Sequence, residues 1–107
     1  MIKNVAITGG THGNELTGVY LVKKWQKHPE LIARESFTTH TKLMNTRAIR
    51  EVRRYIDQDL NRSFGMEDLS DHGLDNYEAK LAKTINSQLG QKGSAHPHVD
   101  FIVDLHT

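Results

Sequence analysis

The chain has 107 residues, 36% hydrophobic and 25% charged, which is enough for one small domain and leaves little material for a second core. The 14 Lys and Arg residues nearly balance the 13 Asp and Glu residues, so the formal net charge of +1 argues against nucleic acid or an anionic membrane as partner. The lack of cysteine excludes disulfides, thiolate metal sites and a cysteine nucleophile, so a metal would need imidazole and carboxylate ligands, and seven histidines are available.

The N-terminal segment is predicted to be a buried strand. Residues 2–8 are rich in strand-forming residues and stop at Gly9-Gly10, which predicts a strand that runs into a sharp turn.

The sequence shows no targeting or membrane segment. The apolar run at its start is too short for a secretory signal, and no stretch reaches the roughly 18 apolar residues of a membrane span. We therefore expect a soluble, cytoplasmic protein.

A helix, a second strand and a less regular segment are expected next. Residues 15–26 have a broad apolar face, with lysines toward the C-terminal end, and predict a helix. Residues 36–44 alternate loosely between apolar and polar side chains, as in a strand, and residues 45–54 fit either a short helix or a turn. Residues 55–72 are polar and lack a sustained period, which indicates a long ordered loop, a feature that is often functional in a compact domain.

A second helix and a third strand complete the pattern. From Asp75, an apolar stripe at four-residue spacing predicts a helix, with Asp75 and Glu78 at capping-box spacing and Gly90 at its C-terminal end. Residues 91–98 form a polar linker, and the nearly continuous apolar run of residues 99–105 predicts a strand buried on both faces. The alternation of strands and helices indicates an α/β domain with a largely parallel sheet, in which ligands bind at the carboxyl ends of the strands.

His12, Glu15 and His106 are the candidate metal ligands. His12 and Glu15 stand three residues apart in the turn after the first strand, and His106 follows the last one. In a parallel sheet they would meet at one edge and supply the two histidines and one glutamate of a catalytic zinc site. The phosphate-loop patterns are absent here, although a chance His–Glu pair is the alternative on spacing alone. The remaining histidines lack a carboxylate at comparable spacing: His28, His40, His72, His96 and His98.

A second group of polar residues lies between Arg53 and Arg62. A solvated, charge-balanced loop is one interpretation of this segment. The other is a binding site for a substrate carboxylate, because a guanidinium holds two oxygens and the amide of Asn61 adds a hydrogen bond. In that case either Asp57 or Asp59 would orient an arginine.

Three motifs together resemble the aspartoacylase and succinylglutamate desuccinylase family. They are the segments 5–19 (VAITGGTHGNELTGV), 54–62 (RYIDQDLNR) and 104–106 (DLH), in the order in which the family has them. The resemblance implies a three-layer, zinc carboxypeptidase-like α/β fold, with a mixed, largely parallel sheet between helices. It also implies hydrolysis of the amide bond of a small N-acylated amino acid.

The same resemblance implies a role for each matching residue. His12, Glu15 and His106 would bind one Zn²⁺ per chain, and Arg54 would polarise the carbonyl that is cleaved. The substrate carboxylate would be held by Asn61 and Arg62, with Asp59 supporting an active-site arginine. The family's proton-transferring glutamate lies well beyond the third ligand. Residues 1–107 are thus expected to be the N-terminal part of the catalytic domain, inactive alone, with the rest of that domain and a β-rich C-terminal domain absent from this chain.

The resemblance favours N-acetylaspartate as substrate, cleaved to acetate and aspartate. Activity of the succinylglutamate desuccinylase type is the alternative within the family. A metal-binding fragment without turnover is the alternative outside it. The oligomeric state is open, a homo-oligomer included.

Overall fold

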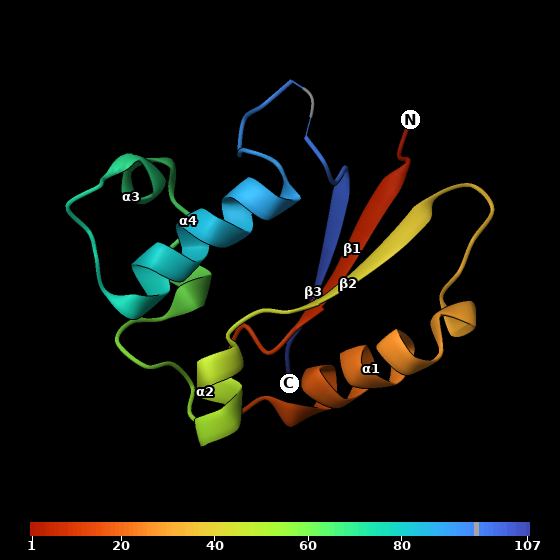
Figure 1. Ribbon diagram of the computed structural model, residues 1–107, viewed down its shortest axis with the longest axis horizontal. Coiled ribbons are helices and arrows are strands. Elements are labelled where there is room, and N and C mark those ends of the chain that lie inside the picture. Colours follow the sequence, from red (N-terminus) through yellow and green to blue (C-terminus); the bar gives the residue numbers. More distant parts are fainter. Residues whose placement is uncertain (96) are drawn as a thin grey trace.

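Three parallel strands and four α-helices make up the described part of the chain (Figure 1). The computed structural model describes residues 1–95 and 97–107, so His96 of the expected polar linker lies outside the described residues. In chain order the elements are β1 (Asn4–Gly9), α1 (Leu16–Lys27), the 3-10 turn η1 (Pro29–Leu31), β2 (Thr38–Leu43), α2 (Thr46–Glu51), the 3-10 turn η2 (Leu60–Arg62), α3 (Met66–Ser70), α4 (Tyr77–Leu89) and β3 (Phe101–Leu105).

The sheet has the strand order β2-β1-β3, with β1 parallel to both neighbours. Gly9, the last residue of β1, pairs with Leu43 on one side and Leu105 on the other. The three strands therefore end at the same edge. The turn after β1 and the residues after β3 meet there, as the sequence predicts.

Helix α1 packs closely against one face of the sheet. Its buried residues are Gly18, Val19 and Val22. A Cβ atom at Gly18 would stand 2.9 Å from the carbonyl oxygen of Leu105, and one at Gly9 would stand 2.5 Å from that of Gly18. Both glycines are needed because a side chain at either position would push the helix off the strands.

Helix α4 covers the opposite face, so the sheet lies between two helical layers. Its Ala82 and Ile85 form a buried cluster with Met44 and Leu60. The face that carries Thr8, Ile102 and Asp104 borders a cleft of about 410 Å³ beside this helix. The largest buried side chains lie here, which makes this the core of the chain.

Two expectations for the segment before and at the start of α4 are wrong. Residues 55–72 are not one irregular loop, because they contain η2 and α3. Asp75 does not cap α4 either: Asn76 does so, and its side chain accepts a hydrogen bond from the N–H of Ala79 at 2.9 Å. Glu78 is fully buried and bonds to a distant segment rather than to the cap, since four donors reach it there.

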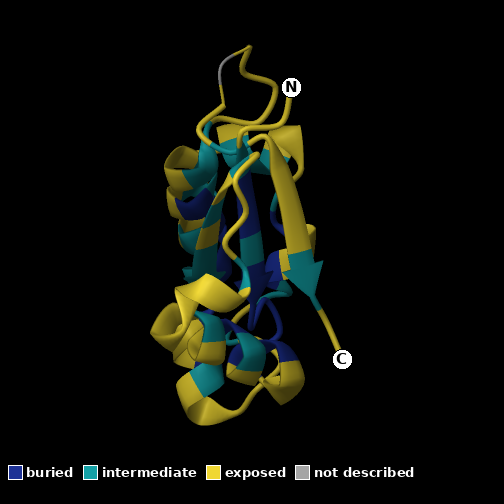
Figure 2. Cartoon of the chain, turned by 90° about the vertical axis from the view of Figure 1, so that its right-hand side faces the viewer, coloured by how far each residue is buried: buried dark blue, intermediate teal, exposed yellow. Residues whose placement is uncertain are grey.

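The expectation that β3 is buried on both faces is also wrong for this chain. Phe101, Ile102 and Val103 are 51%, 48% and 39% exposed. Figure 2 shows the strand that runs to the C label as exposed for most of its length, whereas the neighbouring β1 is largely buried. β3 is apolar, but the described residues do not bury it. Among them, β1 is its one strand partner.

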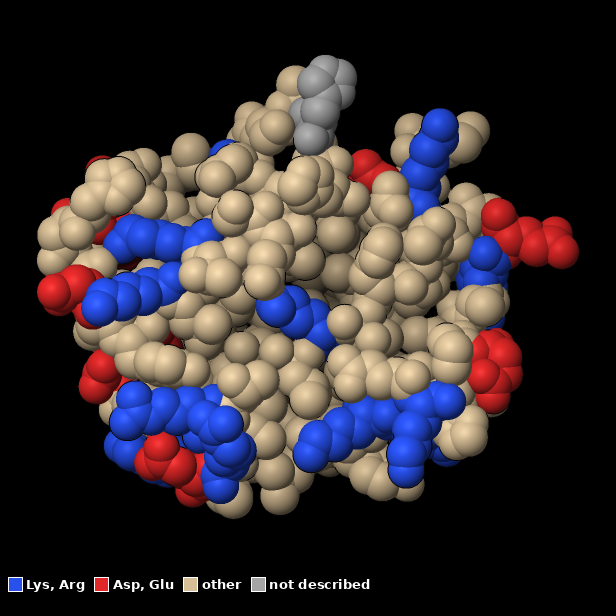
Figure 3. Space-filling model, viewed as in Figure 1, with Lys and Arg blue, Asp and Glu red and all other residues tan. Residues whose placement is uncertain are grey.

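Charges of both signs are spread over the surface. In Figure 3, Lys and Arg side chains gather along the lower part of this face, where α1 and α2 lie, with acidic side chains among and around them. This mixture agrees with the net charge of +1. Within the described ranges, none of the helices has the length and apolar character needed to cross a membrane.

Candidate metal centre

The turn after β1 places a buried histidine at the carboxyl edge of the sheet. Gly10 has a φ of +75°, which a side chain rarely tolerates, and its carbonyl accepts the N–H of Asn45 at 3.0 Å. The chain then turns back, with the N–H of Glu15 donating to the carbonyl of His12 at 3.1 Å. His12 is 4% exposed. The glycine-rich turn thus directs His12 and Glu15 to the same side before α1 begins.

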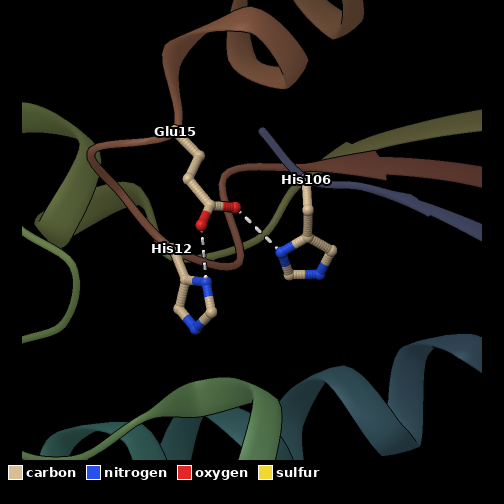
Figure 4. Close-up of side chains that lie close together, drawn as sticks. All are labelled: His12, Glu15 and His106. Atoms are coloured by element: carbon tan, nitrogen blue, oxygen red, sulfur yellow. Dashed lines mark hydrogen bonds and ion pairs between the residues drawn. The ribbon is translucent and has the colours of Figure 1, made fainter.

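His12, Glu15 and His106 come together as the sequence predicts. The Glu15 carboxylate lies between the two imidazole rings (Figure 4), with Oε2 3.0 Å from Nδ1 of His12 and Oε1 2.8 Å from Nδ1 of His106. The ring centroids are 5.2 Å apart. One ligand atom from each residue lies within 4.8 Å of the others. Two imidazoles and a carboxylate in this arrangement fit a Zn²⁺ site that leaves room for a further ligand.

Each imidazole is also held through its other nitrogen by a second carboxylate. Nε2 of His12 lies 2.7 Å from Oδ1 of Asp59, and Nε2 of His106 lies 2.9 Å from Oδ2 of Asp104. Asp104 is fixed in turn by hydroxyl donors from Thr8 and Thr11, at 2.7 and 2.8 Å. A carboxylate behind a histidine ligand orients the ring and makes it a better donor to a metal. Both Nδ1 atoms consequently face the same point.

The electrostatics of the group favour the charged forms. Burial raises the pKa of Glu15, but hydrogen bonds from His12 and His106 outweigh it and lower that pKa below its ordinary value. Burial likewise raises the pKa of Asp59. The hydrogen bond with His12, together with weaker favourable contacts, outweighs burial, so that pKa is lowered below its ordinary value. For His106, burial lowers the pKa, yet bonds to Glu15 and Asp104 leave it raised. The site is a compact set of anionic and imidazole groups, suited to a cation.

Arg54 lies beside the candidate metal ligands, whereas Arg62 does not. The guanidinium nitrogens of Arg54 stand 3.8 Å from Glu15 and 3.8 Å from Asp59. Of the two aspartates considered from the sequence, Asp59 therefore faces the arginine, while Asp57 accepts the N–H of Tyr77 at 2.8 Å. The charged segment is thus not simply a solvated loop.

Asn61 and Arg62 lie on η2, and both are exposed. The N–H of Asn61 donates to Oδ1 of Asp59 at 2.9 Å, and its side chain borders the 410 Å³ cleft together with Asp104. Among the described residues, the Arg62 side chain makes no hydrogen bond or ion pair with the three candidate ligands.

Asp104 is a site residue whose role the sequence does not disclose. The only signal is an acidic residue two positions before His106. The role of Asp104 becomes clear only in the fold. There, Thr8 of the neighbouring strand pairs directly with Asp104 and donates its hydroxyl to the Asp104 carboxylate.

Comparisons with known proteins agree with this geometry. Residues 1–107 match the succinylglutamate desuccinylase/aspartoacylase catalytic domain family. The chain is 56% identical over 106 residues to a protein named "probable aspartoacylase" from Trichodesmium erythraeum, covering 99% of the chain and 36% of the relative. It is 48% identical to aspartoacylase of Xenopus tropicalis, over 98% of the chain and 34% of the relative. An N-acyl-aromatic-L-amino acid amidohydrolase (carboxylate-forming) of the same species is 46% identical, with the same coverage.

The fold is also shared with solved structures. Murine aminoacylase 3 superposes with a TM-score of 0.90 at 43% identity, covering 98% of this chain and 35% of that one. A succinylglutamate desuccinylase from Vibrio parahaemolyticus superposes with a TM-score of 0.75 at 22% identity, covering 98% and 35%. The α/β, zinc carboxypeptidase-like fold expected from the sequence is thereby confirmed. The chain spans about a third of the length of the relatives it matches.

Proposed function

The chain belongs to the succinylglutamate desuccinylase/aspartoacylase family, and we propose that residues 1–107 form the N-terminal part of the catalytic domain of a zinc-dependent N-acyl amino acid amidohydrolase. One observation carries this proposal: His12, Glu15 and His106 meet at the carboxyl edge of the sheet with Arg54 beside them. The remainder of the catalytic domain and a β-rich C-terminal domain are proposed to follow these residues.

His12, Glu15 and His106 would hold one Zn²⁺. When bound, the ion acts as a Lewis acid on the amide carbonyl and makes water a stronger nucleophile at neutral pH. Asp59 and Asp104 keep the two imidazole rings oriented during this reaction.

Arg54 stabilises the oxyanion that develops as the amide carbonyl becomes tetrahedral. Its guanidinium already lies 3.8 Å from Glu15 and from Asp59, so it is held next to the ligand set before substrate arrives. Asn61 and Arg62 bind a carboxylate of the substrate, for which a guanidinium offers two parallel N–H donors. Proton transfer to the leaving amine is assigned to a glutamate that the family resemblance places after residue 107.

N-acetyl-L-aspartate is the proposed substrate. The 56% identical relative named "probable aspartoacylase" and the 48% identical aspartoacylase support this choice. An N-acyl aromatic amino acid is the second candidate, because a relative with that activity in its name is 46% identical. N-succinyl-L-glutamate remains the alternative within the family.

The test uses two proteins: one expressed from the complete reading frame and one limited to residues 1–107. We expect about one zinc per chain in the first, measured by elemental analysis, and hydrolysis of N-acetyl-L-aspartate faster than of N-acetyl-L-phenylalanine or N-succinyl-L-glutamate. The 107-residue protein should bind zinc without turnover. Lack of hydrolysis of all three substrates by the zinc-loaded complete protein would refute the proposal, and a faster reaction with another substrate would replace the substrate named here.

A further inference from the structure

Glu78 is a buried carboxylate that takes no part in the proposed chemistry. It is 0% exposed and lies in the first turn of α4. Burying an anion is unfavourable unless hydrogen bonds replace the water that it loses. Its partners should therefore show what this carboxylate does.

Four donors converge on the Glu78 carboxylate. Oε1 accepts the backbone N–H groups of Asp57 at 2.8 Å and Gln58 at 3.0 Å. Oε2 accepts the N–H of Ile56 and Nδ2 of Asn45, both at 2.8 Å. Burial raises the pKa of Glu78, but these four bonds outweigh burial and lower it below the ordinary value of 4.5. Glu78 is therefore an ionised anchor at neutral pH.

The anchored backbone lies between two residues of the candidate site. Arg54 precedes the three bonded amides, and Asp59 follows them directly. At its far end, Asp59 contacts Nε2 of His12 at 2.7 Å. At its near end, the carbonyl of Arg54 accepts the N–H of Gly13 at 3.2 Å. Any displacement of residues 56–58 would therefore move Arg54 and Asp59 relative to His12.

Asn45 extends the same anchor to the turn after β1. Its N–H donates to the carbonyl of Gly10 at 3.0 Å, and its Oδ1 accepts the N–H of Ala48 at the start of α2. With Oδ1 committed to α2, the side-chain amide can only donate toward Glu78. One carboxylate thus connects α4, the segment that carries Arg54, and the turn that leads to His12.

We propose that Glu78 is a positioning residue for the hydrolytic site, which holds Arg54 and Asp59 in register with the metal ligands through the backbone of residues 56–58. This inference rests on the proposed function. Glu78 makes no hydrogen bond to His12, Glu15 or His106, so its loss should lower turnover while zinc at saturating concentration still binds at one ion per chain.

The test replaces Glu78 by Gln in the protein expressed from the complete reading frame. The introduced amide keeps one acceptor oxygen but turns its NH₂ group toward two of the four donors. We expect kcat for N-acetyl-L-aspartate to fall about a hundredfold, as it does when reacting groups shift by about 1 Å. Zinc should remain at one per chain. Hydrogen exchange should become at least about tenfold faster than in the parent at those of the amides 56–58 that face the new NH₂ group, because these amides lose their acceptor.

Ala82→Gly is the matched control. Ala82 is also buried in α4, and the change weakens the helix without altering any bond to residues 56–58. We expect it to lower the unfolding midpoint while kcat stays within about twofold of the parent.

A second substitution tests the contact directly. In the Glu78→Gln background, Asn45→Asp restores the hydrogen bond with reversed roles, since the introduced amide donates and the introduced carboxylate accepts. It should recover at least about threefold of the lost kcat.

The outcomes separate this inference from the proposed function. Unchanged kcat and unchanged exchange of amides 56–58 in Glu78→Gln would overturn the positioning role, as would a loss of kcat in Ala82→Gly equal to that in Glu78→Gln. If the parent protein hydrolyses no N-acyl amino acid, the proposed function fails instead. The exchange measurement then still reports whether Glu78 anchors the segment.

Discussion

Adding one methyl group at Gly13 should displace the turn that carries His12. A Cβ atom at this position would lie 2.2 Å from the carbonyl carbon of Ala48 and 2.5 Å from the carbonyl oxygens of Ala48 and Arg53. Ordinary van der Waals contact begins at 3.4 Å, so the overlap is about 1 Å. The atoms in the way are all backbone and cannot rotate aside.

The turn that carries His12 must therefore move away from α2 in Gly13→Ala. This overpacking should lower the free energy of unfolding by about 1–3 kcal/mol, measured by urea denaturation followed by circular dichroism. The N–H of Gly13, which donates to the carbonyl of Arg54 at 3.2 Å, should lose this bond as the turn shifts. We expect the Kd for zinc, measured by competition with a chelator, to rise about 10- to 100-fold, the range typical when support of a metal ligand is lost.

Gly65→Ala is the control for this prediction. At Gly65 a Cβ atom would meet nothing closer than the Asp68 carboxylate at 3.6 Å, and the backbone has a φ of −62° that alanine adopts readily. Its stability should stay within about 0.5 kcal/mol of the parent, and its zinc affinity should not change. If Gly13→Ala behaved like Gly65→Ala in both assays, the close approach of the turn to α2 would not constrain the site.

Three further predictions follow from the site and its anchor. His12→Ala or His106→Ala should each remove stoichiometric zinc, measured by elemental analysis, because a three-ligand site then keeps only two ligands. In the complete protein, Arg54→Ala should lower kcat by about two to three orders of magnitude, whereas Arg62→Ala should chiefly raise KM and Arg62→Lys should restore binding in part. The free energy of unfolding should fall as the pH drops below about 4.5, because the lowered pKa of Glu78 makes the folded state bind fewer protons than the unfolded state there.

Each of these has an outcome that would contradict it. Unchanged zinc content in both histidine variants would remove them from the ligand set. An unchanged KM in Arg62→Ala together with a raised KM in Arg54→Ala would exchange the roles of the two arginines. For the pH dependence, Glu78→Gln is the comparison: its stability should vary less between about pH 5 and pH 3 than that of the parent, and an identical slope would show that Glu78 does not contribute.

The three strands, the helices α1 and α4 and the metal-ligand candidates could be predicted from the sequence, whereas η2 and α3 could not. The strand-turn-helix unit over residues 2–26 is correct within about two residues at each end, because apolar periodicity and the Gly9-Gly10 break are local signals. The convergence of His12, Glu15 and His106 also follows from local reasoning. His12 and Glu15 stand in the turn that follows β1, and His106 directly follows β3; parallel strands bring these two ends to one edge of the sheet.

What the sequence could not determine were the environments of individual side chains. Glu78 fits a capping box by spacing, yet donors 20 to 33 positions away along the chain bind it instead. Residue chemistry alone left Asp57 and Asp59 open as partners of Arg54, and only the family resemblance favoured Asp59; in the fold, Asp59 faces Arg54 while Asp57 accepts the N–H of Tyr77. Phe101 and Val103 are apolar yet exposed, because the burial of a strand also depends on what the tertiary structure places against it. Periodicity and capping signals depend on neighbours within about four positions, whereas a carboxylate in the interior binds whichever donors the tertiary structure brings to it.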